Sequence, residues 1–154
     1  MKPWAGIAEM VDAADKVYRY RYTVQADEID DLNHAGNFHY VKWMQHAAIA
    51  HSTAIGWSPE AYDGIGAGWV VRSHQVTYLM PAFVGDDLTI ETWVADMKSA
   101  TSLRRYRILD SQGRLLASAE TNWAFINYER QKPVRIPGEV RSSFEPIITD
   151  YSTS

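Results

Sequence analysis

The pattern of apolar and polar positions divides this chain into strands and one long helix. Residues 18–25 alternate aromatic or apolar side chains with polar ones, which is the period of a half-buried strand. From about residue 37 to residue 55 the apolar positions instead recur at helical spacing, at Val41, Met44, Ala48 and Ile55. Alternation returns over residues 69–79, 88–94, 102–110 and 114–128. We therefore predict a strand, a long helix and then four more strands.

Short signals mark the ends of these elements. Gly56 suits the C-terminal cap of the long helix, and Ser58-Pro59-Glu60 is typical of a helix start, so a short second helix is expected there. Ser111-Gln-Gly113 reads as a hairpin turn. The glycines of residues 64–68 precede a strand rather than open a helix, which argues against a dinucleotide-binding loop.

Helices do not alternate with strands along the chain, so a parallel, doubly wound sheet is not expected. The pattern favours an α+β domain with one antiparallel sheet of about five strands wrapped around the long helix. Residues 132–137 contain two prolines and should close the domain, because proline cannot continue a central strand. We expect a lead-in over residues 1–15, the domain over 16–140 and a loosely held tail over 141–154.

Composition narrows the functional classes. The chain has 154 residues, a formal net charge of −4 and no cysteine, so we expect no nucleic-acid partner, no disulfide and no thiolate chemistry. An apolar signal-peptide core and a membrane-length apolar run are both lacking, which makes a cytoplasmic protein without membrane contact the expectation. Six Trp and nine Tyr either line a pocket or subunit interface or fill the core.

The residues best suited to catalysis form one run, from Asp27 to Trp43. The run puts acidic residues, His34, Gly36 and Asn37 where the long helix should begin. A helix start stabilises negative charge, because its first N–H groups have no partners within the helix. We therefore expect any catalytic chemistry at this point.

Two stretches of the sequence resemble the hotdog fold, and more narrowly the 4-hydroxybenzoyl-CoA thioesterase-like acyl-CoA thioesterases. The first stretch has Asp30, a Tyr ten positions later at Tyr40, and an aromatic three positions after that at Trp43. The second runs from Gly68 through Pro81 to residues 85–92 and resembles the second and third strands of the family and their turn. The resemblance covers about residues 18–140.

The resemblance implies a function and a set of site residues. It implies that Asp30 acts as nucleophile or general base in the hydrolysis of an acyl-CoA thioester, and that the backbone N–H of Asn37 polarises the thioester carbonyl. His34 could orient water or the acyl group. Substrate contacts are expected from Gly36, Tyr40 and Trp69, and no metal or other cofactor is implied.

The same residues also have purely structural interpretations. Asp30 could simply cap the turn or the helix, and Trp69 could be an ordinary core residue. We expect Asp27, Glu28 and Asp31 to lie in solvent. Asp31 is the competitor of Asp30, since a slip of one residue would exchange them.

The chain departs from the family pattern at two positions of this run. Asn33 stands where bacterial members usually have Gly, but Asn tolerates the left-handed backbone that such a turn needs. Leu32 stands where the plant acyl-carrier thioesterases have a catalytic Asn, although residues 34–37 resemble the His-Val-Asn-Asn of those enzymes.

The remaining histidines are expected to be structural or to lie at an interface, and three arginines of one strand have two possible placements. The spacings of His39, His46 and His51 do not match the zinc-binding helix pattern, and His74 has no clear partner. The arginines at 104, 105 and 107 either meet CoA phosphates or, the interpretation we favour, belong to a solvated strand face.

The overall expectation is an acyl-CoA thioesterase that assembles as a homodimer or homotetramer, with sites at the dimer interface. The alternatives are a hotdog hydratase or dehydratase acting on acyl thioesters, which would need an Asp–His pair, and a non-catalytic acyl-CoA-binding protein.

Overall fold

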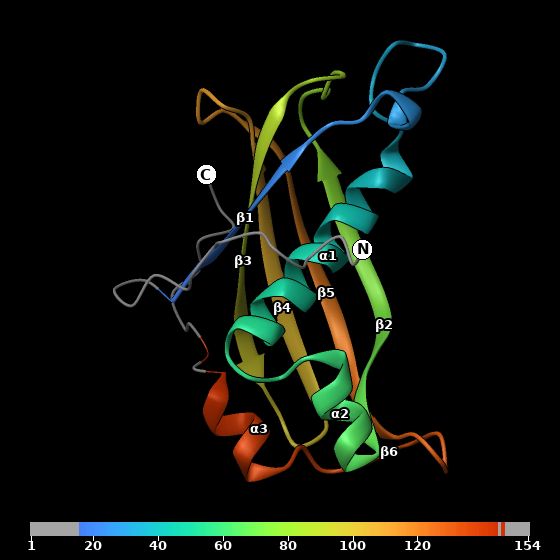
Figure 1. The fold of residues 1–154 in the computed structure, drawn as a ribbon, viewed down its shortest axis with the longest axis vertical. Helices are drawn as coiled ribbons and strands as arrows, with labels where there is room; N and C mark the ends of the chain where they lie inside the picture. Colours follow the sequence, from blue (N-terminus) through green and yellow to red (C-terminus); the bar gives the residue numbers. More distant parts are fainter. Residues whose placement is uncertain (1–15, 145, 147–154) are drawn as a thin grey trace.

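A computed structural model describes residues 16–144 and residue 146 of the chain. The predicted order of elements is confirmed (Figure 1). Strand β1 (Tyr18–Thr23) is followed by a short 3₁₀ helix, η1 (Ala26–Glu28), and by the long helix α1 (Asn37–Ala54). Helix α2 (Pro59–Ile65) and strands β2 (Ala67–Tyr78), β3 (Asp87–Met97), β4 (Thr101–Leu109) and β5 (Leu115–Asn127) come next. A two-residue strand, β6 (Lys132–Pro133), and helix α3 (Gly138–Ser143) complete the described chain.

The strands form one antiparallel sheet in the order β1-β3-β4-β5-β2, with β6 paired to β5. Helix α1 lies along one face of this sheet (Figure 1), as the pattern predicted, and the structure has the hotdog fold that the resemblance implied. Strand β2 is at one edge, and among the described strands only β5 pairs with it. Its outer edge therefore offers unpaired backbone groups.

The core lies between α1 and the inner face of the sheet. Trp43, Met44 and Ala47 of α1 are fully buried against inner-face residues such as Tyr20 and Ile108. Small residues on α1 let the helix approach the sheet closely, and the alternating burial along β4 shows which side chains face it. None of the helices in the described part of the chain is long and apolar enough to span a bilayer.

The local signals at the helix ends are confirmed. Ser58 caps α2, because its hydroxyl accepts a hydrogen bond from the N–H of Ala61 (3.1 Å). Gly56 follows the last turn of α1 with φ +100°, the left-handed conformation that favours glycine.

One expectation about the C-terminal part is wrong. Residues 141–144 are not a loosely held tail: residues 141–143 belong to α3, whose Val140 is fully buried, and Phe144, which follows the helix, is 4% exposed. The Arg141 guanidinium also donates to the carbonyl of Met97 (2.8 Å) and to that of Lys98 (2.6 Å). Two apolar residues at helical spacing, Val140 and Phe144, are too weak a sequence pattern to predict so short a helix. The expected lead-in over 1–15 lies outside the described residues.

Candidate active site

The loop before α1 is a tight turn that depends on Asn33. Asn33 has φ +66°, and its N–H donates to the carbonyl of Asp30 (3.0 Å). The N–H of Asp30 in turn donates to the carbonyl of His34 (2.7 Å). Glycine adopts this left-handed conformation most easily and Asn next, so the Asn that replaces the family's Gly preserves the turn.

Asp30 is exposed, and one of its carboxylate oxygens organises the turn. Oδ1 accepts hydrogen bonds from the N–H groups of Leu32 (2.9 Å) and His34 (3.2 Å). No described residue bonds to Oδ2. The capping interpretation is therefore correct for one oxygen, while the other is available to a substrate or water.

The start of α1 presents backbone donors beside this turn. Gly36 occupies the N-cap position without a side chain to fill it, and its own N–H donates to the carbonyl of Glu28 (2.9 Å). The N–H of Asn37 has no acceptor among the described residues. The first turn is held in place by Tyr78, whose hydroxyl donates to the carbonyl of Asn37 (2.9 Å). An unpaired N–H at a helix start is suited to polarising a carbonyl oxygen.

His34 and Tyr40 lie at this end of the molecule but in different settings. The half-buried ring of His34 packs edge-on against Phe83, with 5.3 Å between centroids. Tyr40 is 2% exposed and its hydroxyl accepts from the N–H of Ala82 (3.1 Å), so it ties the loop before β3 to the helix. Burial raises the pKa of Tyr40. In the described chain Tyr40 is a core residue, and a contact with substrate stays a prediction.

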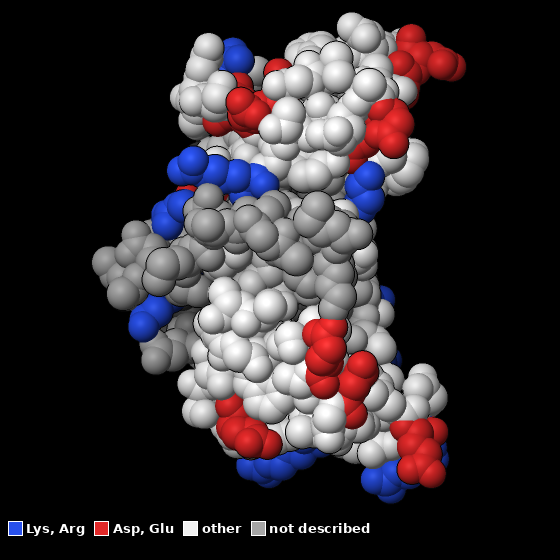
Figure 2. Space-filling model, in the orientation of Figure 1, with Lys and Arg blue, Asp and Glu red and all other residues white. Residues whose placement is uncertain are grey.

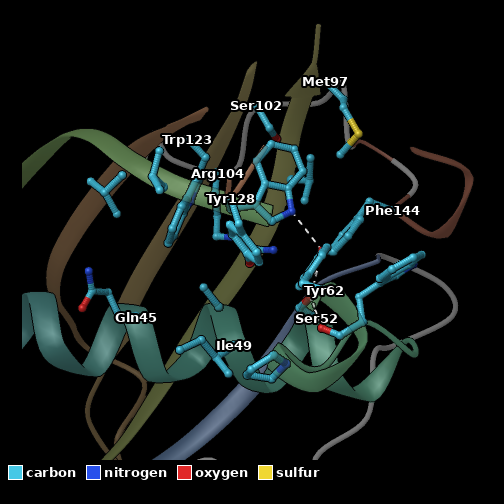
Figure 3. Close-up of a pocket in the computed structure, with 17 residues that line it drawn as sticks. Gln45, Ile49, Ser52, Tyr62, Met97, Ser102, Arg104, Trp123, Tyr128 and Phe144 are labelled. Atoms are coloured by element: carbon cyan, nitrogen blue, oxygen red, sulfur yellow. Dashed lines mark hydrogen bonds between the residues drawn. The ribbon is translucent and has the colours of Figure 1, made fainter. Parts of the chain in front are cut away.

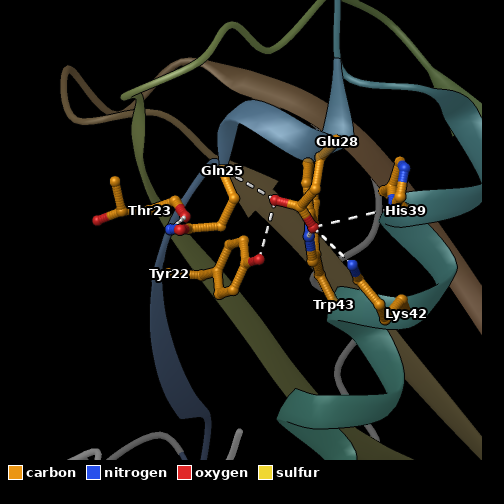
Figure 4. Close-up of polar contacts among 7 residues, drawn as sticks. All are labelled: Tyr22, Thr23, Gln25, Glu28, His39, Lys42 and Trp43. Atoms are coloured by element: carbon orange, nitrogen blue, oxygen red, sulfur yellow. Dashed lines mark hydrogen bonds and ion pairs between the residues drawn. The ribbon is translucent and has the colours of Figure 1, made fainter. Parts of the chain in front are cut away.

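The expectation that Glu28 lies in solvent is wrong: the side chain is 2% exposed. One carboxylate oxygen accepts from the Tyr22 hydroxyl (2.9 Å) and the Gln25 N–H (2.8 Å) (Figure 4). The other accepts from the Trp43 indole N–H (2.8 Å) and pairs with Lys42 (2.7 Å).

Burial by itself raises the pKa of Glu28, but the hydrogen bonds from Lys42, the Gln25 N–H, Trp43 and Tyr22 outweigh it and leave the pKa below its ordinary value. Glu28 is therefore ionised and fixes the loop against α1. Asp27 and Asp31 are exposed as expected. Acidic side chains gather at the upper right in Figure 2, where Figure 1 places this loop.

A cavity of about 440 Å³ lies between the second half of α1, helix α2 and the inner face of the sheet (Figure 3). Trp69 lines it, as expected, and its indole N–H donates to the Tyr62 hydroxyl (2.9 Å). Ser52 extends this polar edge toward Trp57, whose carbonyl accepts its hydroxyl (2.6 Å). The walls are otherwise mainly aromatic or aliphatic, being formed by Trp57, Tyr62, Trp69, Trp123, Tyr128, Phe144 and the aliphatic residues between them.

Arg104 does not belong to a solvated strand face, which corrects the expectation for this arginine. It is 5% exposed, lines the cavity and donates from Nη1 to Nδ1 of His51 (2.9 Å) and to the Thr92 hydroxyl (3.1 Å). Because the Arg donates, Nδ1 of His51 is the acceptor. Burial and then the charge of Arg104 hold the pKa of His51 well below its usual range, so His51 is neutral.

The two other arginines of β4 lie on the outer face, as the expected alternation requires. Arg107 pairs with Glu91 (2.6 Å) and Arg105 approaches Glu120 (3.5 Å). The alternation of side chains along β4 could have identified Arg104 as an inward-facing arginine, because it lies two residues from Tyr106 and four from Ile108, which are both fully buried.

The cavity and the start of α1 are separated along the helix. The first cavity residue on α1 is Gln45, eight residues beyond Asn37, and at 1.5 Å per residue this is about 12 Å. On β2 the cavity touches Trp69, Val70 and Val71, whereas Asn37 is bonded to Tyr78 at the far end of the strand. Within the described residues no group of three or more His, Asp or Glu side chains is arranged to hold a metal ion.

Comparisons with known proteins place the chain among thioesterases by sequence. Residues 15–144 match the acyl-ACP thioesterase N-terminal domain family. Among curated relatives, the chain is 30% identical to a chloroplastic acyl-[acyl-carrier-protein] hydrolase, FATB2 of Cuphea viscosissima, over 87% of this chain and 34% of that protein. It is 22% identical to the long-chain acyl-CoA thioesterase FadM of Escherichia coli, over 81% of this chain and 95% of that one.

Among solved structures, SAV2348 of Staphylococcus aureus, which was solved in complex with CoA, has a TM-score of 0.80 at 18% identity. The match covers 88% of this chain and 89% of that one. Such a likeness establishes the hotdog fold alone.

The match over most of the chain shows that this protein belongs to the acyl-ACP thioesterase N-terminal domain family. It spans about a third of the length of the plant relatives, 34% for FATB2.

Proposed function

We propose that this chain hydrolyses acyl thioesters, with an acyl-CoA as substrate and the free acid and CoA as products. The observation that carries the proposal is the start of α1, where the unpaired N–H of Asn37 lies at the end of a turn built around Asp30. Family membership and the thioesterase relatives support the same reaction.

In this reaction the two groups have complementary tasks. The thioester carbonyl oxygen accepts from the N–H of Asn37, which stabilises the negative charge that develops as the carbonyl is attacked. Asp30 either removes a proton from the attacking water or attacks the carbonyl carbon itself, after which water hydrolyses the resulting anhydride. In both routes the carbon–sulfur bond breaks, the sulfur leaves as a thiolate and takes up a proton, and the oxygen of water ends in the acid. His34 and Gly36 remain proposed as neighbours of the reacting group.

The test is the substitution Asp30→Asn, because the amide keeps an oxygen that can accept from Leu32 and His34 while losing the negative charge. We expect hydrolysis of acyl-CoA, followed with a thiol-detecting dye, to fall by about 10²–10⁴-fold, with the unfolding midpoint unchanged. Asp31→Asn is the matched control and should retain activity. Unchanged turnover in Asp30→Asn would remove the assignment.

We propose further that two copies assemble through β2 and share their sites. The outer edge of β2 is free of described strands, and exposed apolar side chains cluster at its Tyr78 end and beside it, at Leu32, Phe38, Leu79, Met80, Phe83 and Val84. An edge and an apolar patch of this kind are usually covered by a partner. If two β2 strands pair antiparallel, the Tyr78 end of one copy lies beside the Trp69 end of the other. The catalytic turn of one copy then faces the cavity of its partner.

Mixing two inactive variants tests whether the site is shared. Asp30→Asn removes the acid, and Ile49→Trp fills the cavity, which Ile49 lines. Each variant alone should be inactive, whereas co-expression should restore part of the activity, because a mixed dimer contains one site with both parts intact. Absence of rescue in mixed dimers isolated through a different affinity tag on each variant would place both parts in one copy. A cytoplasmic location stays a prediction.

A further inference from the structure

Arg104 is a buried cation without a buried anion to match it. Its side chain lies on the inner face of β4, 5% exposed, and forms part of the cavity wall (Figure 3). Nη1 uses its two hydrogens on His51 and Thr92. Among the described residues, no group accepts a hydrogen bond from Nε or Nη2, and no carboxylate forms an ion pair with Arg104.

Both partners of Arg104 are neutral, so its charge is not compensated. His51 cannot share the charge, because it stays unprotonated, and the Thr92 hydroxyl offers only a dipole. A guanidinium keeps its proton even when buried. A charge removed from water without a counter-charge is strongly disfavoured, and a ligand that carries an anionic group would supply the missing partner.

Arg104 lies among aromatic side chains of the cavity wall. Trp123 lies on β5 opposite Ser102, and Arg104 lies two residues further along that face of β4. Buried polar groups are nearly always hydrogen-bonded. The unused Nε and Nη2 of Arg104 at an aromatic cavity therefore indicate an occupant that brings oxygen acceptors.

We propose that the cavity receives an acyl group whose distal end carries a carboxylate, and that Arg104 binds this carboxylate through Nε and Nη2. This inference deepens the proposed thioesterase function and rests on it. The two donors form the planar fork that a carboxylate matches with two parallel bonds. The aromatic walls contact the apolar middle of the acyl group, and the thioester is left at the cavity mouth. The substrate class is then an ω-carboxyacyl thioester rather than a methyl-terminated fatty acyl thioester.

The test compares ω-carboxyacyl-CoA with methyl-terminated acyl-CoA of the same chain length. The wild-type protein should give the higher kcat/KM for the carboxylated substrate. In Arg104→Met, which keeps the side-chain length without the charge, the ratio of the two kcat/KM values should fall by roughly tenfold to a hundredfold, as expected for loss of a charge-assisted pair. Arg104→Lys keeps the charge without the planar fork, and its kcat/KM ratio should lie between those of the wild type and Arg104→Met. Arg105→Met, on the outer face, is the matched control and should leave the ratio unchanged.

A binding measurement separates failure of this inference from failure of the proposed function. Calorimetry with a free dicarboxylic acid and with the monocarboxylic acid of equal length requires no hydrolysis. Tighter binding of the dicarboxylic acid that is lost in Arg104→Met supports the inference even if no thioester is hydrolysed. Equal binding of the two acids, or a kcat/KM ratio that is the same in wild type and Arg104→Met, overturns it.

Discussion

Replacing Glu28 by Gln should destabilise the fold far more than any other change to an acid in this loop. Glu28 is 2% exposed, and its two oxygens accept from Tyr22, the Gln25 N–H and Trp43 in addition to the contact with Lys42. An amide has one acceptor oxygen and two donor hydrogens. In Glu28→Gln its NH₂ group must therefore face at least one donor that the carboxylate now satisfies.

The magnitude follows from which donors can turn to water. The Lys42 side chain is 42% exposed, so it can re-solvate and its share is at most about 1 kcal/mol. The Trp43 indole and the Gln25 N–H are fixed by the helix and the backbone, and a charge-assisted hydrogen bond from such a donor is worth about 1.5–3 kcal/mol. We expect a loss of about 3–5 kcal/mol, the usual result of removing one partner of a buried charged group.

Urea unfolding followed by tryptophan fluorescence measures this loss, with all variants at one protein concentration because assembly would shift the midpoint. Asp27→Asn is the matched control: it lies in the same 3₁₀ helix, is exposed, and should change stability by less than about 0.5 kcal/mol. Lys42→Met should lose no more than about 1 kcal/mol. A loss below about 1 kcal/mol in Glu28→Gln would refute the buried network.

Three further outcomes are expected. The pKa of His51 lies well below its ordinary 6.5, so below pH 6.5 the unfolded chain binds more protons than the folded one. Stability should therefore fall with falling pH by up to about 1.4 kcal/mol per pH unit. A series of thermal melts at different pH should show a less steep fall in His51→Gln. Asn33 has φ +66°, so Asn33→Gly should be close to neutral and Asn33→Val should cost about 1–2 kcal/mol by chemical denaturation. A Cβ at Gly68 would overlap the Tyr128 hydroxyl and the ring carbon Cζ, so Gly68→Ala should lower stability by about 1 kcal/mol, and an equal loss in a Tyr128→Ala background would count against this contact.

The sequence by itself determined the elements and their order. Alternation and helical spacing predicted β1 to β5 and α1 to within a few residues, because they report which side chains must be buried locally. Ser58, Gly56 and Asn33 predicted a cap, a helix end and a left-handed turn, since each depends only on neighbouring backbone. The family spacing also identified the turn at Asp30 and the start of α1.

Only the tertiary structure decided which charged groups are buried. Glu28 and Asp30 are two residues apart, yet one lies under α1 and the other in solvent, because Trp43 comes back over Glu28 from a helix fifteen residues away. Arg104 and Arg105 are adjacent, and the packing of α1 against one face of β4 placed only Arg104 in the cavity wall, where it is hydrogen-bonded to His51. Desolvation depends on segments that meet in space, so spacing along the chain reports which residues share a face but not what covers that face.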